Sequence, residues 1–185
     1  MVRDLGWRFM DAGRRIERSI QLTTLLRATV TQARGTATDS LLLESVLTAA
    51  ESIITYRFRY RSQAQLETLL DLLLLDPGNP RSLAYQLDRL TDDLDALPIP
   101  SERRLREEQR LVLEASTALR LADLATLAVE QEDGQRSALD DFLGTIQGRL
   151  LLAADAVDRA HFTHVVPVFS LVGPAGTDPS IGRAA

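Results

Sequence analysis

Apolar residues recur every three or four positions along most of the chain, and this spacing predicts amphipathic α-helices rather than strands. Segments rich in turn-forming residues separate the periodic stretches, among them DPGNP at 76–80, PIP at 98–100 and EDGQ at 132–135. The pattern predicts helices over residues 3–31, 40–61, 64–75, 80–97, 101–130 and 136–164. We expect Asn79 and Ser101 to cap two of these helices, with Pro80 in the first turn after Asn79.

These helices predict an all-α fold, an antiparallel helical bundle of about five to six helices. The predicted bundle covers residues 1–165. From residue 166 the composition changes to proline, glycine and small residues. We therefore expect residues 166–185 to form an extended or disordered C-terminal tail.

The first predicted helix carries charged side chains although two of its sides are apolar. Ile16 lies on one side, and Leu22 lies on the opposite side together with Arg14 and Arg18. A helix that is apolar on two sides packs on two sides. We therefore expect some of these arginines to be at least partly covered.

The second predicted helix has the complementary pattern, because Arg57 falls on the face that carries Tyr56 and Tyr60. A buried guanidinium group without a partner is costly, by about 3–5 kcal/mol when its partner is removed. Arg57 is therefore expected to meet a carboxylate, and Glu17 of the first helix is the acid that we expect there. This pairing would hold the first two helices face to face.

Two interpretations of this charge cluster remain open. The cluster consists of Arg14, Glu17, Arg18, Arg57, Arg61 and Arg81. In the first interpretation it is an internal salt-bridge network that fixes the register of the helices. In the second, the arginines exceed the acids because a phosphate or carboxylate from outside completes the site. The position of Arg81 in the predicted first turn of a helix fits an anion site as well as an ordinary helix cap.

The composition excludes several kinds of chemistry. The chain has no cysteine, and all 21 of its basic residues are arginine. A thiol nucleophile, a disulfide framework, a Schiff-base lysine and a Walker-type phosphate lysine are therefore absent. We expect no cofactor, because no glycine-rich loop stands between a strand and a helix.

The charge distribution bears on the partners. The net charge is -5, but residues 1–61 are basic and the remainder is acidic. Pairing between these two parts of the chain is favoured over nucleic-acid binding, because nucleic-acid binders usually have a basic excess over a whole face. The longest apolar run, residues 72–75, is too short to cross a bilayer, so we expect no membrane contact and a cytoplasmic location.

One group of potential metal ligands stands near the end of the last predicted helix. Asp158, His161 and His164 follow one another at intervals of three residues. Metal-binding helical bundles use two such motifs and further carboxylates from other helices. We therefore expect no metal site here.

An ordered set of motifs resembles the Alpha-E family. The segment RDLGWRFMDAGRRIERSIQLTTLLR at 3–27 carries the conserved Glu-Arg pair that names the family, here Glu17 and Arg18. The resemblance continues through residues 51–87 and through HFTHVVPV at 161–168, with Phe169 in place of an expected basic residue. It implies a bacterial all-helical domain of unknown function. Family members are typically longer, so this chain resembles their C-terminal part.

The resemblance also implies a functional context. Alpha-E domains are associated with circularly permuted ATP-grasp proteins, alongside transglutaminase-like proteins, in presumed peptide-forming or peptide-modifying systems. The leading expectation is a non-catalytic helical partner of an ATP-grasp ligase, with self-association as a further possibility. The alternative is a module that binds or transforms a phosphorylated or carboxylated small molecule through the arginine cluster. The family supplies no catalytic residues that could be assigned to this chain.

Overall fold

The computed structural model describes residues 4–98 and 105–162, and its elements are helical. They are α1 (Leu5–Thr29), α2 (Thr36–Ala49), α3 (Ile53–Tyr60), α4 (Leu66–Leu70), a π-helical turn η1 (Asp71–Leu75), α5 (Leu83–Asp95), α6 (Glu107–Arg120), α7 (Leu124–Leu127) and α8 (Ser137–His161). Strand-like pairing within the described ranges is limited to one isolated bridge between Gln32 and Gln135. The all-α prediction is confirmed.

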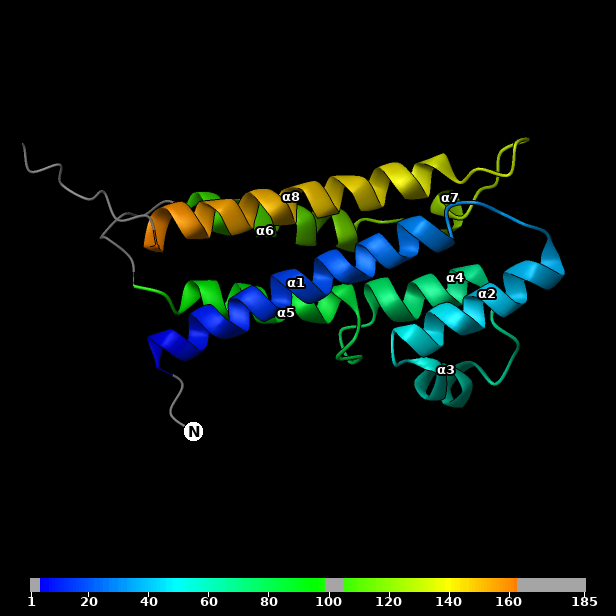
Figure 1. The fold of residues 1–185 in the computed structure, drawn as a ribbon, viewed down its shortest axis with the longest axis horizontal. Coiled ribbons are helices and arrows are strands. Elements are labelled where there is room, and N and C mark those ends of the chain that lie inside the picture. The colour runs from blue at the N-terminus through cyan, green and yellow to red at the C-terminus, as the bar shows by residue number, and fades with distance from the viewer. Residues whose placement is uncertain (1–3, 99–104, 163–185) are drawn as a thin grey trace, which may run out of the picture.

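Four helices, α1, α5, α6 and α8, form the body of the molecule. The most extensive helix packing is that of α1 with α5, α5 with α6, α6 with α8, and α8 with α1, which closes a ring of four. Figure 1 shows α1 between α8 on one side and α5 on the other, with both neighbours running antiparallel to it. Helices α2, α3 and α4 gather beside the C-terminal half of α1, outside this ring. The bundle interior is filled mainly by leucine.

The predicted helix at 40–61 is divided into α2 and α3. Glu51 adopts a left-handed conformation with φ of 50°, and its N–H donates to the Thr48 carbonyl (3.0 Å). The N–H of Ser52 donates to the Leu47 carbonyl (2.8 Å). These two bonds form a Schellman motif, which ends a helix and usually has glycine at the left-handed position. The sequence gives no such signal here, so the prediction of one continuous helix was wrong.

The predicted cap of the fourth helix was also wrong. Ser82 caps α5, since its hydroxyl accepts the N–H of Tyr85 (3.1 Å). Asn79 is buried in the preceding turn, where its side-chain oxygen accepts the N–H of Arg81 (3.1 Å) and its amide donates to the Leu72 carbonyl (3.1 Å). Asparagine favours such local side-chain bonds in turns as much as helix caps, so the sequence could not separate the two roles.

Two further boundaries differ from the predictions. The helix expected over 101–130 ends at Arg120, and α7 follows after Asp123, whose carboxylate accepts from the N–H of Ala125 (3.2 Å) and the hydroxyl of Thr126 (2.6 Å). The C-terminal half of the range expected for the third helix is the π-helical turn η1. The predicted cap at Ser101 and the predicted tail at 166–185 lie outside the described residues.

The basic first third of the chain pairs with the acidic remainder, as expected. Arg8 contacts Asp93 at 2.8 Å, and Arg27 contacts Asp140 at the same distance. A third pair of this kind joins Arg59 to an acid of the turn before α5. None of the helices described here is both long and apolar enough to cross a bilayer.

Candidate functional site

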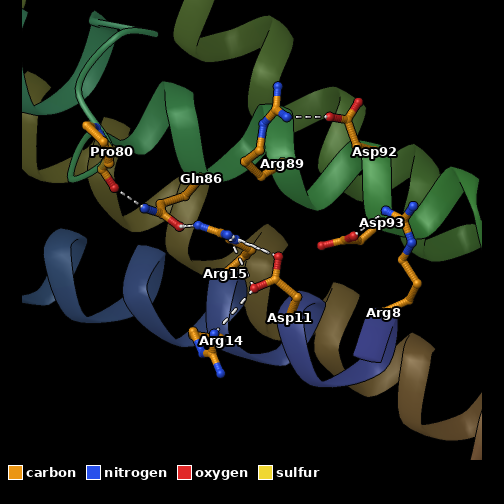
Figure 2. A network of polar contacts seen from close by, with 9 residues as sticks. All are labelled: Arg8, Asp11, Arg14, Arg15, Pro80, Gln86, Arg89, Asp92 and Asp93. Carbon is orange, nitrogen blue, oxygen red and sulfur yellow. Dashed lines mark hydrogen bonds and ion pairs between the residues drawn. The ribbon is translucent and has the colours of Figure 1, made fainter. Parts of the chain in front are cut away.

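A buried charge network joins α1 to α5. Asp11 is 3% exposed, and its carboxylate receives bonds from Nε (3.2 Å) and Nη2 (3.0 Å) of Arg15. Arg15 also donates from Nη1 to the side-chain oxygen of Gln86 (3.2 Å), and Gln86 donates to the Pro80 carbonyl (2.5 Å). Figure 2 shows this chain of contacts running from α1 into the turn that precedes α5. The network therefore fixes both the register of the two helices and the position of Gln86.

A second buried carboxylate lies beside the first. Asp93 of α5 is 2% exposed, and its Oδ1 accepts from Nη1 of Arg8 at 2.8 Å. Burial raises the pKa of the Asp93 carboxyl group; hydrogen bonding to Arg8 opposes this shift, and the nearby Asp11 adds to it. Its Oδ2 is buried and has no hydrogen-bond donor in the described structure. A proton on Asp93 would let this oxygen donate to Asp11, so the two acids can share one negative charge.

The expected pairing of Glu17 with Arg57 is wrong. Glu17 is exposed, and its carboxylate accepts a bond from the amide of Gln21 (3.1 Å). Arg57 is 64% exposed in its side chain and lies 3.6 Å from Glu44 of α2. The Schellman motif is the physical reason, because it rotates α3 away from the direction of α2. Tyr56 remains on the buried side of α3, while Arg57 turns to solvent.

The first two helices are consequently not clamped by buried ion pairs. Arg14 is exposed and contacts Asp11 at 3.6 Å within its own helix. Arg61 ends α3 in a left-handed conformation, with φ of 49°, and is also exposed. Four of the six residues of the predicted cluster therefore do not converge on a common site, namely Arg14, Glu17, Arg57 and Arg61.

Arg18 and Arg81, by contrast, come together in one cavity. This cavity has a volume of about 290 Å³ and lies between α1, the end of α2 and the turn before α5. We call it the Arg18 cavity, and its lining is Arg18, Gln21, Leu22, Leu25, Ala49, Ala50, Glu51, Arg81 and Gln86. Both arginines belong to the predicted cluster, and neither was predicted to lie near Glu51 or Gln86.

The electrostatics of the Arg18 cavity favour an anion. Arg81 forms an ion pair with Glu51, which is the residue in the left-handed conformation. Arg18 is half-buried, and its guanidinium group makes no hydrogen bond or ion pair with any described residue. The lining therefore has two positive groups and one negative group. An unusual backbone conformation and an unpaired cation are features that cluster at binding sites.

Gln86 connects the cavity to the buried network. Its side chain lines the cavity and is held by Arg15 on one side and by the Pro80 carbonyl on the other. The same network holds the turn before α5, where Arg81 lies. Rigid support of this kind holds binding groups in place before a ligand arrives.

The potential metal ligands are not assembled into a site within the described residues. His161 packs its ring against Phe9, with ring centroids 4.9 Å apart, and lies 3.4 Å from Arg106. His164 falls outside the described part of the chain. Nowhere in the described ranges do three histidine, aspartate or glutamate side chains come close enough to hold a metal ion.

Comparison with known proteins gives the family. The sequence model of Alpha-E, described as a predicted alpha-helical domain with a conserved ER motif, matches residues 1–162. The chain belongs to the Alpha-E family. The resemblance seen in the sequence is thus confirmed. That resemblance assigns the ER pair to Glu17 and Arg18, and Arg18 lines the Arg18 cavity.

The curated relatives carry the name uncharacterized protein. Proteins of Mycobacterium bovis and Mycobacterium tuberculosis are 38% identical to this Alpha-E chain over 182 residues, which is 98% of the chain. The chain spans only 19% of the length of each of these relatives. No solved structure matches it.

Proposed function

We propose that this Alpha-E domain is a non-catalytic binding domain that holds a carboxylate or phosphate group in the Arg18 cavity. The observation that supports this most directly is the half-buried guanidinium group of Arg18, which has no partner in the described structure. Arg18 lines the same cavity as Arg81. Guanidinium groups bind carboxylates and phosphates through paired, charge-assisted hydrogen bonds.

The size of the cavity favours a terminal group over a whole ligand. Pockets for complete small molecules have volumes of roughly 300–1,000 Å³. The Arg18 cavity, at about 290 Å³, is at the lower end of this range. It fits the anionic end of a larger molecule, with the remainder of that molecule outside the cavity.

The lining argues for binding without catalysis. Its ionisable residues are Arg18, Arg81 and Glu51, and Glu51 is engaged by Arg81. A catalytic site needs a nucleophile or a general acid or base that can reach its ligand. The remaining lining side chains are glutamine, leucine and alanine, which supply none of these functions.

The wider role that we propose is that of an accessory domain of an ATP-grasp ligase in a peptide-forming or peptide-modifying system. The association of Alpha-E domains with circularly permuted ATP-grasp proteins supports it. The short span of this chain relative to its curated relatives is consistent with it, because in those proteins the matching region is joined to much longer sequence. The cavity would then hold the anionic end of the substrate or of the ligase partner.

Anion binding is tested by calorimetric titration of the 185-residue chain with inorganic phosphate and with succinate. We expect Arg18→Gln to weaken binding about tenfold or more, since it removes one charge-assisted contact. The melting temperature should hardly change, because Arg18 makes no ion pair in the described structure. Arg61→Gln is the matched control, since the Arg61 side chain also has no ion pair or hydrogen bond with any described residue but is not part of the cavity lining. Equal affinities for wild type and Arg18→Gln would contradict the proposed site.

The accessory role is tested separately with the ligase. The ATP-grasp protein associated with this domain is assayed for ATP-dependent ligation in the presence of the wild-type domain, of Arg18→Gln and of no domain. We expect product formation to fall several-fold without the domain and to fall similarly with Arg18→Gln. Ligation that proceeds at the same rate in all three reactions would exclude the accessory role while leaving anion binding intact.

A further inference from the structure

A second hollow lies on the other side of α1. It has a volume of about 410 Å³ and runs between α1 and the C-terminal part of α8. We call it the α1–α8 groove, and its apolar walls include Phe9, Gly13, Ile16, Ile20, Ala154 and Val157. Figure 1 shows α1 and α8 as antiparallel neighbours that lie closer together towards the C-terminal end of α1. The groove differs from the Arg18 cavity in being lined mainly by apolar side chains.

Gly13 keeps this groove open. A Cβ atom placed on Gly13 would meet no atom of the described residues within 4 Å, so among these residues the position faces free space. Glycine is unfavourable in the middle of a helix relative to alanine. The helix therefore carries a destabilising residue at a position where a larger side chain would project into the groove.

The groove and the Arg18 cavity meet at the exposed ridge of α1. Gln21 lines both hollows, and Glu17, which accepts its hydrogen bond, lines the groove. Arg18, the next residue along the helix, lines the cavity. Glu17 and Arg18 thus face the two hollows, which lie on either side of this ridge.

We infer that the ligand of this domain is an extended peptide with a free C-terminal carboxylate. This inference rests on the proposed function, because the carboxylate would bind at Arg18 and Arg81. The peptide would cross the ridge of α1 and place apolar side chains in the α1–α8 groove. At roughly 3.3 Å per residue, three to four extended residues are about as long as a helix is wide.

The polar ridge favours a peptide over a fatty acid. A peptide backbone offers N–H groups to the carboxylate of Glu17 and carbonyl groups to the amide of Gln21, and both side chains are exposed between the two hollows. A hydrocarbon chain on the same path would remove water from these groups without replacing its hydrogen bonds, which is unfavourable. The arginines of the Arg18 cavity match the C-terminal carboxylate of such a peptide, and the α1–α8 groove matches its apolar side chains.

The test uses an acetylated tetrapeptide of leucine and valine with a free C-terminus, titrated into the full chain. We expect Gly13→Leu to weaken peptide binding about tenfold by filling the groove, as for the loss of one buried aliphatic contact. Binding of succinate at Arg18 should not change in this variant. Gly148→Leu is the matched control, because Gly148 also faces open space but lies on α8 outside the groove lining. Val157→Thr, which keeps the side-chain shape, should weaken peptide binding several-fold. It takes the place of Gly13→Leu in the test if that variant does not fold.

The outcomes separate this inference from the proposed function. Peptide binding that Arg18→Gln weakens but Gly13→Leu and Val157→Thr leave unchanged would overturn the groove assignment and leave the anion site standing. If Arg18→Gln affects neither peptide nor succinate, both proposals fail. The C-terminally amidated peptide should bind at least about tenfold more weakly than the acid. If octanoate binds as tightly as the peptide and Gly13→Leu weakens its binding, the ligand is a fatty acid and the peptide assignment is wrong.

Discussion

Replacing Asp11 with alanine is expected to lower the free energy of unfolding by about 3 kcal/mol, because it leaves a largely buried arginine without its partner. The side chain of Arg15 is 15% exposed and forms its ion pair with Asp11 at 3.0 Å. Without Asp11, the only hydrogen-bond acceptor left to the Arg15 side chain among the described residues is the neutral side-chain oxygen of Gln86.

The expected loss is measured by urea and thermal unfolding of the full chain at neutral pH. For a domain of this size, a loss of about 3 kcal/mol corresponds to a fall of roughly 6–12 °C in the melting temperature. Asp92→Ala is the matched control on α5, because the Arg89–Asp92 pair has side chains that are 49% and 57% exposed. Exposed pairs of this kind contribute about 1 kcal/mol or less. A melting temperature of Asp11→Ala equal to that of Asp92→Ala would contradict a structural role for the buried network.

The helical periodicity was sufficient to predict the fold class but not the points at which helices break. Long apolar repeats identified α1, α5 and α8 to within a few residues. The division between α2 and α3 could not be predicted, because Glu51 occupies a left-handed position that glycine usually marks. One undetected turn was enough to misplace Arg57, since every residue after it faces a different direction.

The candidate site was predicted in part. Arg18 and Arg81 were both named from the sequence, but sequence patterns place a residue on a face of its own helix and do not show which distant residue lies opposite. The contact of α1 with the start of α5 brings the two arginines to one cavity. The partner expected for the cluster, Glu17, lies instead on the exposed ridge of α1.

The buried network escaped the sequence analysis although a signal for it exists. Asp11 and Arg15 are four residues apart and share the face of α1 that continues with Leu22, which is buried. Asp93 likewise follows Leu90 at the spacing of the buried face of α5. Charged residues at apolar positions of two helices are candidates for mutual pairing, and this criterion would have selected Asp11, Arg15 and Asp93 ahead of Glu17 and Arg57.

The second carboxylate of the network should respond to substitution in the opposite direction from Asp11. Asp93→Asn is expected to raise the free energy of unfolding by about 1–2 kcal/mol at pH 7, because an amide can satisfy the buried Oδ2 position. Its oxygen can still accept from Arg8, and its NH₂ group can donate to Asp11, where the wild-type oxygen has no donor in the described structure. The substitution also removes one of two negative charges that are buried side by side.

The pH dependence of this effect identifies its cause. The pKa of Asp93 is raised in the folded protein by burial and by Asp11, despite the opposing contact with Arg8, so the folded state binds this proton more tightly than the unfolded chain does. Its contribution to stability is therefore complete below the ordinary carboxyl pKa and is lost as the pH rises through the raised value. Wild type and Asp93→Asn should unfold alike in acid and diverge towards neutral pH in urea titrations, with the variant the more stable. A variant that is less stable than wild type at pH 7 would show that ionised Asp93, paired with Arg8, stabilises the interface between α1 and α5.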